Sequence, residues 1–78
     1  MGFVMNWMFE PETGAYRYAG ELENGWVLFL RPAPGGWRAW AQRVRTGPKS
    51  HMQKTFGVDR GDTVRAKELA LAWAHQLN

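Results

Sequence analysis

The chain has 78 residues, is 45% hydrophobic and 22% charged, and carries a formal net charge of +3. This length and composition indicate one globular domain over residues 1–78 and exclude a disordered chain. The lack of cysteine excludes disulfides and cysteine-based zinc sites, and no apolar run approaches the ~20 residues that a membrane helix needs.

The first sixty or so residues are cut into short segments by turn sequences that are rich in Gly, Pro, Asn and Asp. Aromatic and β-branched residues dominate these segments, so the sequence predicts strands over residues 3–9, 16–22, 26–31, 37–45 and 51–56. The Asn24-Gly25 pair between the second and third segments predicts a β-hairpin, because Asn-Gly is the strongest short hairpin signal.

The C-terminal segment changes to the period of an amphipathic helix, and its apolar residues are Ala66, Leu69, Ala70, Trp73, Ala74 and Leu77. Asp62 or Thr63 can cap this helix, because both side chains accept hydrogen bonds from first-turn amides. We expect the alanines to allow a close approach to a sheet, with Leu69, Trp73 and Leu77 reaching deeper. The sequence therefore predicts an α+β fold: an antiparallel meander of about three to five strands packed on one C-terminal helix over roughly residues 62–77.

The strand expected over residues 37–45 has two mixed faces, because side chains alternate along a strand. One face carries Trp37, Ala39, Ala41, Arg43 and Arg45, and the other carries Arg38, Trp40, Gln42 and Val44. The first face suits contact with a helix at its alanines, and the second suits a core at Trp40 and Val44. The pattern alone leaves both arrangements open, and a bulge could mix them.

Positive charge is concentrated in the second half of the chain. Residues 1–35 sum to −2, whereas residues 36–78 sum to +5. The stretch from residue 38 to residue 54 contains no carboxylate and carries the basic residues Arg38, Arg43, Arg45, Lys49 and Lys54. Such a segment attracts a polyanion before any specific contact forms, and nucleic acid is the usual polyanion.

The five tryptophans fit either a dense core or stacking against nucleic-acid bases. We expect Trp7, Trp26 and Trp73 in the core. Trp37 and Trp40 lie among arginines, where core packing and stacking fit equally well.

Part of the chain resembles an AP2-type domain and the related arm-type DNA-binding domain of phage tyrosine integrases. The resemblance lies in Gly35-Gly-Trp-Arg-Ala-Trp, Lys54-Thr-Phe-Gly and Ala66-Lys-Glu-Leu-Ala-Leu-Ala-Trp-Ala, and it covers roughly residues 35–74. It implies a three-stranded sheet on a C-terminal helix that lies in the DNA major groove. The contacts carried over are Arg38, Arg43, Arg45 and Lys54, with Trp37 as an apolar or stacking contact. The aromatic N-terminal third departs from the minimal domain, and with no catalytic domain after Asn78 we expect a stand-alone binder or an excised domain.

We therefore expect a non-enzymatic, cytoplasmic protein of phage or bacterial type that binds nucleic acid, most naturally double-stranded DNA. The expected contacts are Arg38, Arg43, Arg45, Lys49, Lys54 and Trp37. The alternative is a phage-type inhibitor that binds a host enzyme or defence complex through an aromatic surface, in the manner of an anti-CRISPR protein. An exposed apolar patch around Trp7, Trp26 and Trp37 would favour that alternative. A homodimer formed through an exposed strand edge fits either hypothesis.

Catalysis has little support in the sequence. Ser50 and His51 are adjacent, so within a strand they would point to opposite faces and could not act as nucleophile and base. His75 falls in the last helical turn, where the helix dipole favours a histidine. The sequence lacks a phosphate-binding loop, a dinucleotide fingerprint and zinc-ligand spacing, so we expect no catalytic, cofactor-binding or metal-binding residues and no membrane partner.

Overall fold

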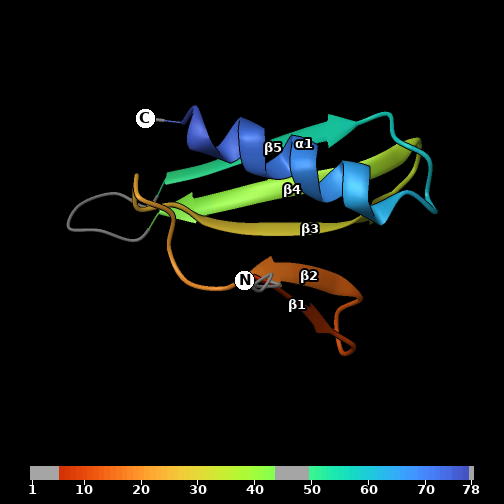
Figure 1. Ribbon diagram of the computed structural model, residues 1–78, viewed down its shortest axis with the longest axis horizontal. Coiled ribbons are helices and arrows are strands. Elements are labelled where there is room, and N and C mark those ends of the chain that lie inside the picture. Colours follow the sequence, from red (N-terminus) through yellow and green to blue (C-terminus); the bar gives the residue numbers. More distant parts are fainter. Residues whose placement is uncertain (1–5, 44–49, 78) are drawn as a thin grey trace, which may run out of the picture.

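The computed structural model describes residues 6–43 and 50–77, and these form one antiparallel sheet and one helix (Figure 1). The strands occur in sheet order as a meander, and the helix comes last, which confirms the predicted α+β fold. The elements are β1 (Trp7–Glu10), β2 (Ala15–Tyr18), β3 (Val27–Ala33), β4 (Gly36–Arg43), β5 (Ser50–Phe56) and α1 (Thr63–His75). Residues 3–5 of the first expected strand and residues 44–45 of the fourth lie outside the described residues. Within the described ranges, no helix is long and apolar enough to cross a membrane.

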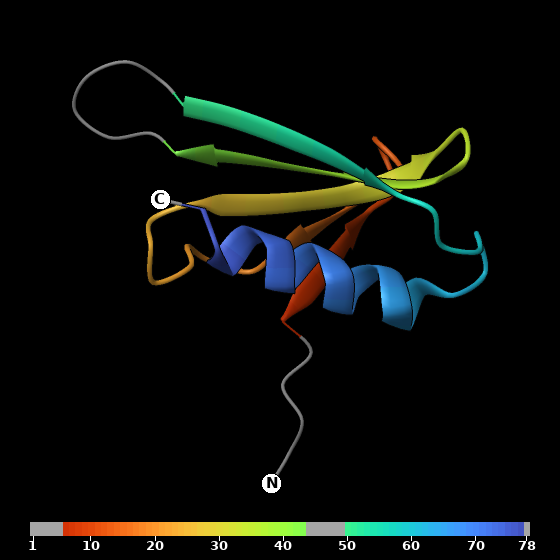
Figure 2. The same cartoon turned by 90° about the horizontal axis from the view of Figure 1, so that it is seen from above.

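The helix covers one face of the sheet, against β3 and β4 (Figure 2). The side chains beneath it are buried: Leu28, Leu30, Trp37, Ala39 and Ala41. Leu28 and Leu30 are fully buried, and removing each from water contributes about 1.5–3 kcal/mol. The core therefore lies on the Trp37, Ala39 and Ala41 face of β4, which decides the question that the alternation in sequence left open.

The helix approaches the sheet through alanines. Ala66, Ala70 and Ala74 have no exposed surface, whereas Leu69 and Trp73 are half-buried. The expectation that Leu69, Trp73 and Leu77 reach deepest is therefore wrong, because small side chains let the helix backbone come so close that larger ones are displaced to the sides. The side chain of Asp62 caps the helix and accepts a hydrogen bond from the Arg65 amide at 3.1 Å.

The connection between β2 and β3 is longer than the predicted hairpin. The two strands pair only at Tyr16–Leu30 and Arg17–Phe29, and residues 19–26 join them. The Asn24 side-chain amide donates to the carbonyl oxygens of Ala74 and Leu77, at 2.9 and 3.1 Å. The tight turn that Asn-Gly predicts is present within this connection, because the Gly25 amide donates to the Leu22 carbonyl oxygen at 2.8 Å and the Leu22 amide donates to the Trp26 carbonyl oxygen at 2.9 Å. Asn24 in addition gives the last carbonyls of the helix a side-chain donor.

A two-residue hairpin loop, Pro34 and Gly35, joins β3 to β4. Ala33 and Gly36 pair on either side of this turn, and Gly35 has a φ of +85°. A proline followed by a glycine of positive φ is the signature of a type II turn. Gly36 has a φ of +147°, and a Cβ placed on it would meet the Phe56 carbonyl oxygen at 2.1 Å. This close approach between the start of β4 and the end of β5 requires glycine.

Candidate nucleic-acid interface

No described element covers the face of β3, β4 and β5 opposite the helix (Figure 2). We call this surface the open face. Strand alternation and the register of the pairs place on it Val27, Phe29, Arg31, Arg38, Trp40, Gln42, His51, Gln53 and Thr55. The set includes arginines, glutamines and aromatic rings but no carboxylate. The open face is therefore positive and rich in hydrogen-bond donors.

Two arginines stand directly opposite each other on the open face, since Arg31 of β3 pairs with Arg38 of β4. Arg31 lies 5.4 Å from the centroid of the Trp40 ring, and Arg38 Nε donates to Thr55 Oγ1 at 3.5 Å. Among the described residues, neither arginine forms a salt bridge with a carboxylate. Like charges opposite each other across strands destabilise a sheet, and an anion bound between them would offset that cost.

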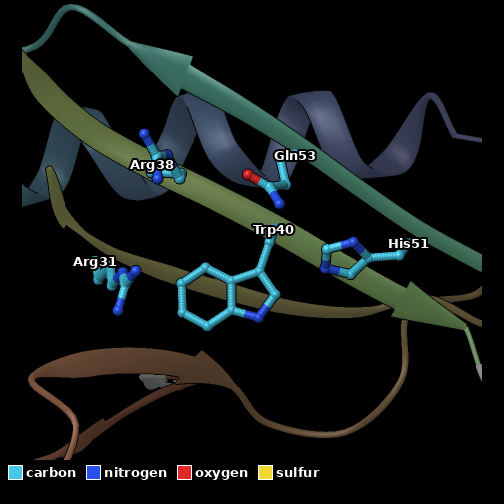
Figure 3. Close-up of a pocket in the computed structure, with 5 residues that line it drawn as sticks. All are labelled: Arg31, Arg38, Trp40, His51 and Gln53. Carbon is cyan, nitrogen blue, oxygen red and sulfur yellow. The ribbon is translucent and has the colours of Figure 1, made fainter.

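Trp40 forms the apolar centre of the open face. Its indole stacks on Phe29 of the neighbouring strand, with the ring centroids 5.1 Å apart and the planes 10° from parallel. Beside the indole is an open recess of about 220 Å³ that is lined by Arg31, Arg38, Trp40, His51 and Gln53 (Figure 3). These residues come from all three strands, so the recess exists only when β3, β4 and β5 are paired.

A second recess of about 300 Å³ adjoins the same arginines at the β1–β2 and β3–β4 turns. It is lined by Thr13, Gly14, Arg31, Pro32, Ala33, Pro34 and Arg38. Arg31 and Arg38 therefore line both recesses.

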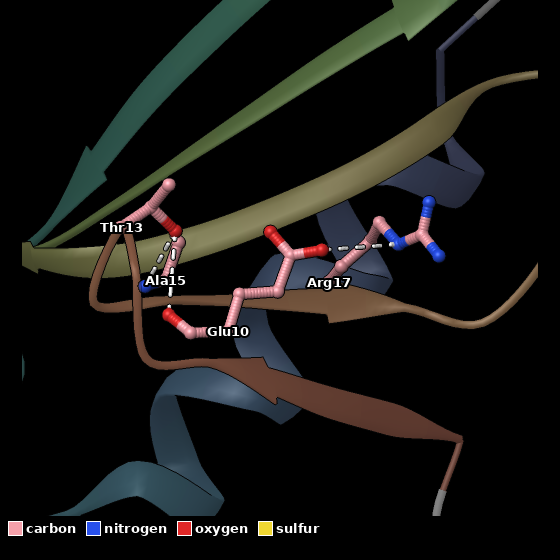
Figure 4. A network of polar contacts seen from close by, with 4 residues as sticks. All are labelled: Glu10, Thr13, Ala15 and Arg17. Carbon is pink, nitrogen blue, oxygen red and sulfur yellow. Dashed lines mark hydrogen bonds and ion pairs between the residues drawn. The ribbon is translucent and has the colours of Figure 1, made fainter.

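The positive surface ends at the β1–β2 hairpin. Glu10 lies 3.7 Å from Arg17 and neutralises it on the open side of this hairpin (Figure 4). The Thr13 hydroxyl closes the turn, because it donates to the Glu10 carbonyl oxygen at 3.4 Å and accepts from the Ala15 amide at 3.3 Å. On the open side of the sheet, the described cations without a carboxylate partner are therefore Arg31 of β3 and Arg38 of β4.

Of the sequence-predicted contacts within the described residues, only Arg38 lies on the open face. Arg43 and Lys54 lie on the helix side of the sheet, over the rings of Trp26 and Phe56. Trp37 is 2% exposed, and its Nε1 donates to the Asp59 carbonyl oxygen at 3.1 Å. The expectation of Trp37 as a stacking contact is therefore wrong, because the helix covers its face of β4. Arg45 and Lys49 lie outside the described residues.

The prediction missed Arg31, Trp40, His51 and Gln53 as members of one site. Arg31 precedes the basic segment along the chain, so counting charge by position overlooked it. The Pro34-Gly35 pair in the sequence indicates this arrangement, because a two-residue hairpin loop there places Arg31 directly opposite Arg38.

Comparison of this chain with protein-family models, with curated protein sequences and with solved structures gives no match. In the part of the chain that the structure describes, no group of three or more His, Asp or Glu side chains is arranged to hold a metal ion. The case for a function therefore depends on the geometry and charge of the open face.

Proposed function

We propose that this protein is a non-enzymatic nucleic-acid-binding protein that docks the open face of its sheet on double-stranded DNA. The observation that carries the proposal is a sheet face with two opposed arginines, a half-buried indole at its centre and no carboxylate. A protein surface that has no partner for its own cations is suited to a polyanion.

The arrangement of β3, β4 and β5 with α1 on one side supports DNA duplex as the ligand. It is the arrangement that the resemblance to AP2-type and integrase arm-type domains implies, with the sheet as the reading surface. The major groove is about 12 Å wide and admits a β-ribbon. In this mode Arg31 and Arg38 bind phosphates, and Gln42 and Gln53 reach base edges.

The first test is a titration of labelled duplex DNA at several salt concentrations, followed by fluorescence anisotropy. Each phosphate contact contributes about −0.9 to the log–log salt slope, so the double variant Arg31→Ala/Arg38→Ala should flatten the slope by about two units. Arg65→Ala is the matched control, because this exposed helical arginine lies on the other layer beside Glu68. Undiminished binding by the double variant, or equal losses in the control, would contradict the proposal.

The inhibitor alternative depended on an exposed aromatic surface away from the arginines. Trp26 and Trp37 are buried, and Trp7 packs edge-on against Tyr18 at 5.2 Å. The exposed Met8 and Phe9 are neighbours on β1 and point to opposite faces, so they do not form one patch. Trp26 and Trp37 are therefore absent from the surface that the inhibitor alternative requires.

A further inference from the structure

The indole of Trp40 presents a broad ring face on the open side of the sheet. In Figure 3, which views the sheet with α1 behind it, the ring is seen nearly face-on with Arg31, Arg38, His51 and Gln53 around it, and the Arg31 guanidinium lies 5.4 Å from its centroid. Trp40 lines the recess, and its stacking partner Phe29 does not. The recess therefore opens onto the part of the indole that Phe29 leaves free.

A fully paired duplex cannot stack a base on the free part of the Trp40 indole. Its bases are stacked on one another, so a protein in either groove meets base edges and not base faces. An unpaired base has a free face, and stacking on an aromatic side chain stabilises such a base whatever its sequence. A flat indole set among cations therefore matches an unpaired nucleotide better than it matches a base pair.

The groups around the indole fit the remaining parts of one nucleotide. Arg31 and Arg38 stand together on one side of the ring, where they can bind the phosphate that adjoins the base. Gln53 and His51 of β5 lie on the opposite side, and both offer hydrogen bonds to a base edge. Phosphate, base face and base edge thus each have a counterpart within one recess.

We infer, on the basis of the proposed function, that the recess holds one unpaired nucleotide of a duplex, with its base stacked on Trp40 and its phosphate between Arg31 and Arg38. The protein would then prefer duplex DNA that carries an extrahelical base over the same duplex fully paired. Nucleic-acid binding and this preference are separate properties, because the arginines act on any duplex and the indole acts only on a free base.

The test compares three labelled duplexes of one sequence by anisotropy: fully paired, with a central one-nucleotide bulge, and with an abasic residue in that bulge. A stacked base should tighten binding to the base-containing bulge by about 5-fold to 100-fold. The abasic bulge has the same flexible backbone without a base, so it should bind like the paired duplex. Equal affinity for both bulges would overturn the inference, because the preference would then come from DNA deformability.

Variants at Trp40 show whether the indole is responsible. Trp40→Ala should bring the affinity for the bulged duplex down to that for the paired duplex, while Trp40→Phe should retain part of the preference. Wild-type protein that binds paired and bulged duplexes equally would overturn the inference but leave the proposed function intact. Binding to none of the duplexes would overturn both. Tighter binding to the corresponding single strand than to the bulged duplex would also overturn the inference, in favour of a single-strand binder.

Discussion

Trp37 and Trp40 lie on the same strand, with Arg38 and Ala39 between them, and have opposite surroundings. Trp37 faces α1, is 2% exposed and donates a hydrogen bond to Asp59. Trp40 faces away from α1, stacks on Phe29 and lines the recess beside Arg31. The residue type and the neighbouring sequence are similar, so the difference comes from which side of β4 the helix covers.

The same contrast holds across the whole sheet. Under the helix, small and apolar side chains such as Ala39 and Leu30 are packed against the alanines of α1. On the other side, the neighbouring positions Arg38 and Arg31 are solvated cations. Stability is therefore concentrated on one face, which leaves the other free to carry charges whose mutual repulsion costs stability.

The largest predicted effect is a difference in stability between alanine variants of the two tryptophans. Trp37→Ala should lower the free energy of unfolding by about 3–5 kcal/mol, because it removes a buried ring and leaves a cavity. Trp40→Ala should lower it by about 0.5–1.5 kcal/mol, through loss of the stacked pair with Phe29. Urea denaturation followed by circular dichroism measures both. Similar losses of stability in the two variants would show that the open face contributes as much to core packing as the helix-covered face does.

A second prediction concerns Gly36, where β4 closely approaches the end of β5. Gly36→Ala should cost about 3 kcal/mol, because the new Cβ collides with the Phe56 carbonyl oxygen at a positive φ. Gly57→Ala is the matched control, since a Cβ there meets nothing within 4 Å. The difference between their urea midpoints reports the strain, and a Gly36→Ala midpoint equal to that of the control would disprove it.

A third prediction tests the close approach of the helix. Ala70→Leu should destabilise the protein by about 1–3 kcal/mol, because Ala70 is fully buried against the sheet and the added atoms overpack it. Ala72→Leu introduces the same side chain on the exposed side of the same helix and should leave stability nearly unchanged. Thermal unfolding of the pair gives the comparison. A stable Ala70→Leu variant would mean that the helix can move away from the sheet without penalty.

A fourth prediction concerns Arg31→Glu, which should raise stability slightly and weaken DNA binding. Arg31→Glu converts the opposed arginines into an ion pair with Arg38, which should raise the free energy of unfolding by about 0.2–1 kcal/mol. The same change places a carboxylate on the open face and should weaken duplex binding more than Arg65→Glu does. A protein that becomes more stable while it loses DNA affinity cannot owe that loss to misfolding. Unchanged affinity would count against the open face as the interface.

The sequence predicts the elements of this fold better than it predicts the site. The alanine-rich period from Ala66 to Ala74 is long and regular, so the helix was evident, and the turn residues divided the strands nearly where the structure does. The Asn24-Gly25 pair predicts the local turn but not the hydrogen bonds of Asn24 to the helix end, because those partners lie far away in sequence.

The site was harder because charge density along the chain does not show which face of a strand a residue occupies. Arg43 and Lys54 belong to the basic segment but lie on the helix side, whereas Arg31 lies outside that segment and joins the open face through strand pairing. Only the choice of core face separates these residues, and that choice depends on packing between Ala39 and the distant Ala70. Local pattern does not contain this information.

The contacts of α1 have a consequence for synthesis on the ribosome. Leu28 and Leu30 are in one core cluster with Ala66, Ala70 and Ala74 of the helix. The Asn24 side-chain amide donates to the carbonyl oxygens of Ala74 and Leu77. The meander can pair strand by strand as it emerges, but its apolar side stays exposed until α1 has left the exit tunnel. A nascent chain stalled before residue 66 would therefore expose the apolar face of the sheet to chaperones and proteases. Packing of α1 on that face ends the exposure.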